Sequence, residues 1–251
     1  MTPAHLANLG VHIAAGTIAL AIGFTMLANA KGTLSHRRMG RIFCYFTLLV
    51  CCSAAIGTVF FRFVPIFAVL SILVPYQLIG AWRSACTRAQ GPAGVDAAWT
   101  VLALAVSIAL TPAVLRHSTV APIVVYSSLG ALATLLFYDA IRWLFPRRWY
   151  RVLWKYEHAY KMIASIFGML SALVGNVIRV GQPWSQILPS VAGVLVVIYI
   201  FCKLYRQDKM SLTYAGMSQT PEADRPFPTG HSMTAANSIM IRPIAHRETT
   251  P

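Results

Sequence analysis

Seven long apolar stretches dominate this chain and constrain its fold more than any motif does. A helix needs about 20 apolar residues to cross the hydrocarbon core of a bilayer, where its backbone groups must pair with one another. Only 11% of the 251 residues are charged, whereas soluble domains carry about 25%. The sequence therefore predicts an all-α membrane protein, a bundle of seven transmembrane helices. The predicted spans are 6–29, 42–61, 64–82, 97–115, 121–144, 160–179 and 186–204.

Lysine and arginine fall almost wholly on alternate loops between these spans. Segments 30–41, 83–96 and 142–161 hold four, two and six of them, and the segment after residue 202 holds six more. The opposite loops hold three, which are Arg62, Arg116 and Arg179. Because cytoplasmic loops of membrane proteins are enriched in Lys and Arg, this bias predicts an N-terminus outside and a C-terminus in the cytoplasm.

The net charge of +14 has the same explanation. A basic surface is the usual sign of nucleic-acid binding, but here the charges flank apolar spans and form no patch on a soluble unit. We therefore expect the lipid bilayer and its anionic headgroups as partners, and no nucleic acid. Residues 1–205 form the expected transmembrane domain. Residues 206–251 contain scattered polar and charged residues and are expected to form a disordered cytoplasmic tail.

The first predicted helix carries a histidine on a face of small residues. Small side chains let a neighbouring helix approach closely, so the histidine is expected to face that contact. Its ring either makes a hydrogen bond between helices or takes part in cofactor binding or a proton relay. The face consists of His12, Gly16, Ala19, Gly23 and Met26.

The sixth predicted helix carries a semi-polar stripe whose members recur at steps of four and three residues. At a rise of about 1.5 Å per residue, this stripe runs for roughly 27 Å, nearly the thickness of a bilayer core. Ser and Asn are costly in contact with lipid, so the stripe is predicted to point inward. It lines either a packed helix interface or a path through the membrane. The stripe consists of His158, Met162, Ser165, Met169, Ala172 and Asn176.

Titratable groups gather at the predicted cytoplasmic edge. His36 lies at the entrance to the second helix, Asp139 lies three residues before Arg142 in the fifth, and His158 opens the sixth. If these helices are neighbours, His36, Asp139 and His158 converge. Two imidazoles and a carboxylate would then orient a b-type haem or a divalent metal, with His36 and His158 as the candidate metal ligands. The alternative is a set of interfacial salt bridges and headgroup contacts.

A basic motif surrounds His36 at the start of the second span. Arg37 and Arg41 are expected to serve topology and to contact lipid headgroups. Gly40 is expected to let the chain turn or pack closely at this point.

Three segments resemble a known family. They read HIAAGTIAL (12–20), HRRMGRIFCY (36–45) and HAYKMIASIFGMLSALVGN (158–176). They are similar to the uncharacterised bacterial membrane family called domain of unknown function 2306. Its members share a His-Arg-x-x-Gly-Arg turn after the first helix and a late helix that starts with His and ends with Asn. The resemblance covers roughly residues 8–204, implies a multi-pass protein of the bacterial inner membrane, and implies no particular reaction. The matching positions are His12, His36, Arg37, Gly40, Arg41, His158, Met162, Ser165, Ala172 and Asn176.

Three functions remain open from the sequence. The first is a protein that binds or moves a small ligand or protons along an inward polar face. The second is a membrane oxidoreductase in which His36 and His158, or His12, ligate haem b, a hypothesis supported by a weaker resemblance to ascorbate-reducible b-type cytochromes. The third is a scaffold or sensor. Motifs of soluble enzymes such as G-x-S-x-G and H-E-x-x-H are missing, so we expect no soluble-type enzyme activity.

Overall fold

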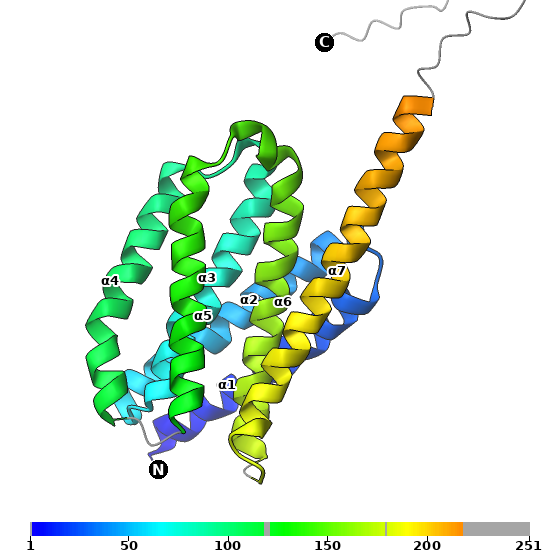
Figure 1. The fold of residues 1–251 in the computed structure, drawn as a ribbon. Coiled ribbons are helices and arrows are strands. Elements are labelled where there is room, and N and C mark those ends of the chain that lie inside the picture. Colours follow the sequence, from blue (N-terminus) through cyan, green and yellow to red (C-terminus); the bar gives the residue numbers. More distant parts are fainter. Residues whose placement is uncertain (1, 118–120, 179, 218–251) are drawn as a thin grey trace, which may run out of the picture. The chain divides into compact units, whose positions relative to one another are not determined.

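The structure is a computed structural model that describes residues 2–117, 121–178 and 180–217 (Figure 1). The chain divides into two compact units, Met1–Asp208 and Lys209–Pro251. The helical bundle belongs to the first unit. The description that follows concerns that bundle.

The described residues form helices joined by short connections and contain no strand, which confirms the predicted all-α class. Seven of the helices are long and apolar enough to cross a membrane. The long helices are α1 (Pro3–Ala28), α2 (Leu34–Ile56), α3 (Pro65–Thr87), α4 (Gly94–His117), α5 (Pro122–Ile141), α6 (Tyr150–Val177) and α7 (Trp184–Met217). The short helical turns are η1 (Gly57–Phe61), η2 (Arg88–Gln90), η3 (Arg142–Leu144) and η4 (Arg147–Trp149).

Several helices extend beyond the predicted apolar spans. The second begins at Leu34 rather than 42, because the side chain of Thr33 accepts a hydrogen bond from the backbone N–H of His36 and caps it. The sixth begins at Tyr150 rather than 160. Charged turns that hydropathy assigns to loops are good helix formers and continue the helices. The seventh helix runs to Met217, so the expected tail does not begin at 206, and residues 218–251 lie outside the described part.

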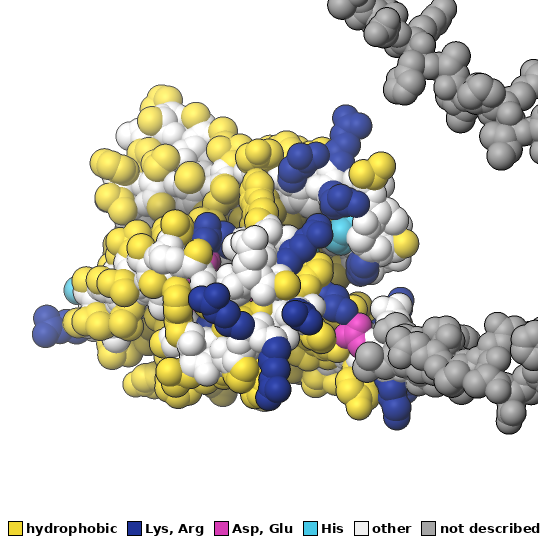
Figure 2. Space-filling view, turned by 90° about the horizontal axis from the view of Figure 1, so that it is seen from above, with side chains coloured by type: hydrophobic (Ala, Val, Ile, Leu, Met, Phe, Trp, Pro, Cys, Tyr) yellow, Lys and Arg dark blue, Asp and Glu magenta, His cyan; other side chains and the backbone are white. Residues whose placement is uncertain are grey.

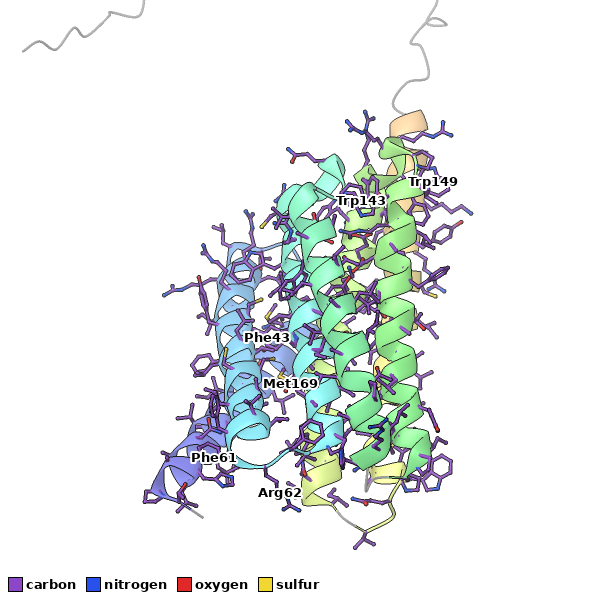
Figure 3. All side chains as sticks on the ribbon, turned by 90° about the vertical axis from the view of Figure 1, so that its left-hand side faces the viewer. Phe43, Phe61, Arg62, Trp143, Trp149 and Met169 are labelled. Carbon is purple, nitrogen blue, oxygen red and sulfur yellow. The ribbon has the colours of Figure 1, made fainter. Side chains whose placement is uncertain are left out.

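Two apolar clusters fill the bundle, and α3 contributes to both. The first joins α1, α2 and α6 with Val74 and Leu78 of α3. Figure 3 shows two of its members, Phe43 and Met169, at a similar level between the helices. The second cluster joins α4 and α5 with Val69 and other residues of α3. The helices α4 and α7 have the smallest buried share and lie at the edge of the bundle.

One end of the bundle is strongly basic. We call the end that carries segments 88–93 and 142–149 the basic end. Figure 2 shows Lys and Arg side chains gathered on this face. Its segments are held together because the Tyr150 hydroxyl donates to the backbone carbonyl of Arg142 and its ring packs on Gly91. Gly91 has a φ of +79°, a conformation that favours glycine. The exposed cations of segments 88–93 and 142–151 are Arg88, Arg147, Arg148 and Arg151.

Candidate functional site

A buried ion network lies between α3, α4, α5 and α6, towards the basic end. We use this name for six charged side chains and the hydroxyl groups that bond to them. Five of the six charged residues are at least nine-tenths buried, and Lys161 is completely buried. The charged members are Arg83, Asp96, Asp139, Arg142, Glu157 and Lys161. The hydroxyl members are Tyr76, Ser84, Thr100 and Tyr138.

Lys161 of α6 and Asp139 of α5 form the deepest pair. The Nζ atom of Lys161 donates to Oδ1 and Oδ2 of Asp139, at 2.6 and 2.9 Å. Tyr76 of α3 donates its hydroxyl proton to Oδ2 of the same carboxylate, at 2.7 Å. Gly80 of α3 leaves the room that this requires, because a Cβ atom there would lie 3.2 Å from the Nζ atom of Lys161. Three helices therefore meet at one carboxylate.

Arg142 links this pair to a second carboxylate. Its Nη1 atom donates to Oε2 of Glu157 at 3.0 Å and lies 3.6 Å from Oδ1 of Asp139. Glu157 also accepts hydrogen bonds from Ser84 at 2.9 Å and from Tyr138 at 2.6 Å. The Nε atom of Arg142 is buried and has no hydrogen-bond partner. Arg142 therefore keeps an unused donor inside the network.

The third carboxylate connects the network to the surface. Asp96 accepts from Nε and Nη2 of Arg83, at 2.5 and 3.0 Å, and lies 3.7 Å from Nη2 of Arg142. Arg83 is the most exposed member of the network, with 27% of its side chain accessible. Thr100 lies 2.9 Å from the Tyr76 hydroxyl and also bonds to the backbone carbonyl of Asp96. A continuous series of hydrogen bonds therefore runs from Arg83 to Lys161.

The charges of the network balance. Three cations face three carboxylates, so the buried group is neutral when all six are ionised. Moving an unpaired ion from water into a protein interior costs several kcal/mol. Within the network that cost is offset by ion pairs and hydrogen bonds to every carboxylate. A proton can move between Lys161 and Asp139 with no change in the total charge, which is the chemistry that such a pair allows.

Of the predicted site residues, Asp139 belongs to this network, and its predicted proximity to Arg142 is present. The hypothesis that His36, Asp139 and His158 meet is wrong. Asp139 bonds to Lys161 and Tyr76, while Nδ1 of His158 bonds to the carbonyl of Ala81 at 3.0 Å. Within the described ranges, no three His, Cys, Asp or Glu residues lie close enough to hold a metal ion. The physical reason is that α3 packs against α2, α5 and α6 and occupies the space the three residues would share.

His36 and His158 lie on α2 and α6, which share the first apolar cluster. The Nδ1 atom of His36 is buried without a hydrogen-bond partner. His36 also lines a pocket of about 340 Å³ between the end of α1 and the start of α2. The two imidazoles remain candidates for a shared ligand, separate from the ion network.

His12 makes the hydrogen bond between helices that was one of the two predicted roles. Its Nδ1 atom lies 2.8 Å from the Ser53 hydroxyl of α2. Because that hydroxyl donates to the carbonyl of Val50, the histidine nitrogen is the donor. The small-residue face points inward as expected. A Cβ atom on Gly23 would lie 3.0 Å from Ile166 and 3.2 Å from Phe43.

The stripe on α6 lines a packed interface along only part of its predicted length. Ser165 is buried and donates to the carbonyl of Lys161, while Met162 and Met169 pack in the first apolar cluster. Asn176 is exposed and donates to the carbonyl of Ala172 on its own helix. The prediction that the stripe continues inward to Asn176 is therefore wrong, since a side chain near the end of a helix can bond its own backbone.

The basic motif of α2 differs from its predicted geometry. Arg37 and Arg41 are exposed, as headgroup contacts require. Gly40 lies inside α2 rather than at its start, so it makes no turn. A Cβ atom on Gly40 would lie 3.3 Å from Cε of Met26, which fits the expected close packing.

Lys161 was not among the predicted site residues. This lysine was counted with the loop charges, although position 161 falls inside the predicted sixth span. A charge within an apolar helix is costly unless it is paired, so its position was a usable signal. Its spacing of four residues from Glu157 indicates the shared helix face.

Comparison with protein-family models, curated proteins and solved structures found no match. The functional argument therefore depends on the geometry of this chain.

Removing one charge of the Lys161–Asp139 pair should lower the free energy of unfolding more than removing both charges. Lys161→Met leaves Asp139 buried without its main partner and should lower the free energy of unfolding by about 3–5 kcal/mol. Adding Asp139→Asn removes both charges and should restore most of the loss, because the remaining four charges still balance. Unfolding of purified protein in mixed micelles measures both effects.

The matched control is the Lys155–Asp208 pair, which has a similar Nζ–Oδ1 distance of 2.6 Å but is about 30% exposed. Lys155→Met should change stability by less than about 1 kcal/mol. Equal effects of Lys155→Met and Lys161→Met would contradict the assigned burial.

Proposed function

We propose that this protein is a multi-pass protein of a bacterial inner membrane, with its N-terminus outside and its C-terminus in the cytoplasm. Seven helices of membrane-spanning length support insertion. The gathering of Lys and Arg at the basic end supports placing that end in the cytoplasm. The three quoted motifs support membership of the family called domain of unknown function 2306, which is part of the same proposal.

The ion network is proposed to bind protons and to move them between the cytoplasm and the membrane interior. The observation that carries this function is the buried Lys161–Asp139 pair, which hydrogen bonds through Tyr76 join to Thr100. Ionisable groups at membrane depth are expensive and commonly form proton relays. We favour protons over a small ligand because Thr100, Tyr76, Asp139 and Lys161 form a series in which each group lies within hydrogen-bond distance of the next.

The relay begins at the hydroxyl of Thr100, which the backbone carbonyl of Asp96 holds beside the Tyr76 hydroxyl. Tyr76 passes the proton on to Asp139, since hydroxyl groups both donate and accept. A protonated Asp139 is neutral and no longer balances the positive charge of Lys161. The Lys161 side chain then moves towards Glu157 or releases its own proton. Helix movement between α5 and α6 would then expose the deep end of the relay to the opposite side.

Proteoliposomes with an internal pH-sensitive dye test this function. The wild-type protein should dissipate a pH gradient, and the Asp139→Asn/Lys161→Met variant should lower that rate by about tenfold or more, because relay groups contribute at least this much to proton transfer. The control variant Lys155→Met/Asp208→Asn should retain the wild-type rate. Equal rates in all three proteins, with the fold intact, would exclude a proton-moving role for the network.

Haem b binding is a second candidate, favoured by the hydrogen bonds of two histidines. Nδ1 of His158 must donate to the carbonyl of Ala81, which leaves Nε2 free to ligate, the arrangement found in metal-binding histidines. Nδ1 of His12 donates to Ser53 in the same way. His36 supplies a second imidazole for His158.

Visible absorption of the purified protein after expression with haem precursors tests the second candidate. A haem protein should show a Soret band that His36→Ala and His158→Ala each abolish. Colourless wild-type protein after reconstitution with haem would exclude it. The proton assay remains informative in either case because it uses different residues.

A further inference from the structure

An apolar groove runs between α4 and α5 and ends at the ion network. Its volume is about 530 Å³, within the range of small-molecule sites. Leu104, Ile108, Leu132, Leu136 and Phe137 form most of its walls. On α4 the wall runs from Thr111 to Thr100, a length of roughly 17 Å at the rise of an α-helix. The groove is therefore long, narrow and parallel to the helices.

The hydroxyl groups along the groove leave its wall apolar except at one end. Ser107 and Thr111 donate to carbonyls one turn earlier on α4, at 2.6 and 2.7 Å. Thr100 differs, because its hydroxyl also lies 2.9 Å from the Tyr76 hydroxyl. Thr100 thus belongs both to the groove and to the network, and it is the point at which an apolar ligand would meet hydrogen-bonding groups.

The position and charge of the Thr100 end of the groove determine which ligand head group can bind there. Thr100 lies about 9 Å along α4 from Gly94, the first residue of that helix. A head group at Thr100 would therefore lie inside the bundle and not at its end. The network beside it is neutral in total charge. A charged phosphate would lose its hydration there without a free cation to pair with, since Arg83, Arg142 and Lys161 already face carboxylates.

We propose that the α4–α5 groove binds a single-chain amphiphile with a small uncharged head. The chain lies along the groove, and a hydroxyl group of the head donates to the hydroxyl oxygen of Thr100, whose own proton is donated to the carbonyl of Asp96. The ligand enters sideways from the bilayer, because residues of both walls, such as Ile108 and Phe137, are exposed. This inference rests on the proposed membrane insertion but not on proton movement.

Photolabelling in lipid nanodiscs tests the site directly. The probe is a monoacylglycerol with a diazirine in its acyl chain, and the labelled peptides are identified by mass spectrometry. We expect labelling to concentrate on the facing residues of α4 and α5. Ala133 and Ala140 line the groove. Ala133→Leu and Ala140→Leu should each reduce labelling by about fivefold or more, because an added side chain overfills the groove.

Ala131→Leu is the matched control, since Ala131 is exposed on the same helix but does not line the groove. It should leave labelling unchanged. Unlabelled monoolein should compete with the probe, whereas oleoyl lysophosphatidic acid, which has the same chain and a phosphate, should compete at least about tenfold more weakly. Thr100→Val should remove this preference while keeping the shape of the side chain.

Three results would overturn the proposal. Equal labelling in Ala133→Leu and Ala131→Leu would mean that bulk lipid fills the groove. Equal competition by the two lipids would exclude selection of an uncharged head. Cross-links between two copies of the chain across α4 and α5 would assign the groove to a self-association surface. Labelling and the pH assay measure different properties. A groove that binds no ligand can therefore be distinguished from a network that moves no protons.

Discussion

The amine of Lys161 has no access to solvent, and the rest of the site follows from the need to neutralise it. Its carboxylate partner comes from α5, and Tyr76 of α3 holds that carboxylate from the other side. Gly80 leaves space for the lysine where any larger residue would displace it. One buried charge therefore sets the relative positions of three helices. Apolar packing is less selective, because many side-chain arrangements fill a core equally well.

The same requirement accounts for the contrast between the interior and the surface of the basic end. The buried charges are matched in number and sign, whereas the exposed charged residues of segment 142–151 are all cations. Exposed cations fit an anionic membrane surface, while a buried set must be close to neutral to be tolerated. The excess of cations that the sequence places at this end includes Lys161, Arg142 and Arg83. In the folded chain each of them pairs with a carboxylate.

The seven long helices could be predicted from the sequence because hydropathy and helix length are local properties. The inward face around His12 could also be predicted from the spacing of small residues. The pairing of helices could not. Asp139 was recognised as important, but it was expected to meet His36 and His158 rather than Lys161, because nothing local says that α3 packs against both α2 and α5. The starts of α2 and α6 were placed too late, since charged residues are good helix formers and continue a helix beyond its apolar span.

The central claim is that the Lys161 amine contacts the Asp139 carboxylate in the folded protein within a bilayer. Solid-state NMR measures this contact through dipolar dephasing between ¹⁵Nζ-labelled lysine and ¹³Cγ-labelled aspartate. The Asp208→Asn variant removes the other Lys–Asp pair seen among the described residues. If the two groups are in contact, one lysine signal should be strongly dephased in that variant, and the effect should be lost when Asp139→Asn is added. Weak dephasing that is the same in both variants would show that the Lys161 amine and the Asp139 carboxylate are apart.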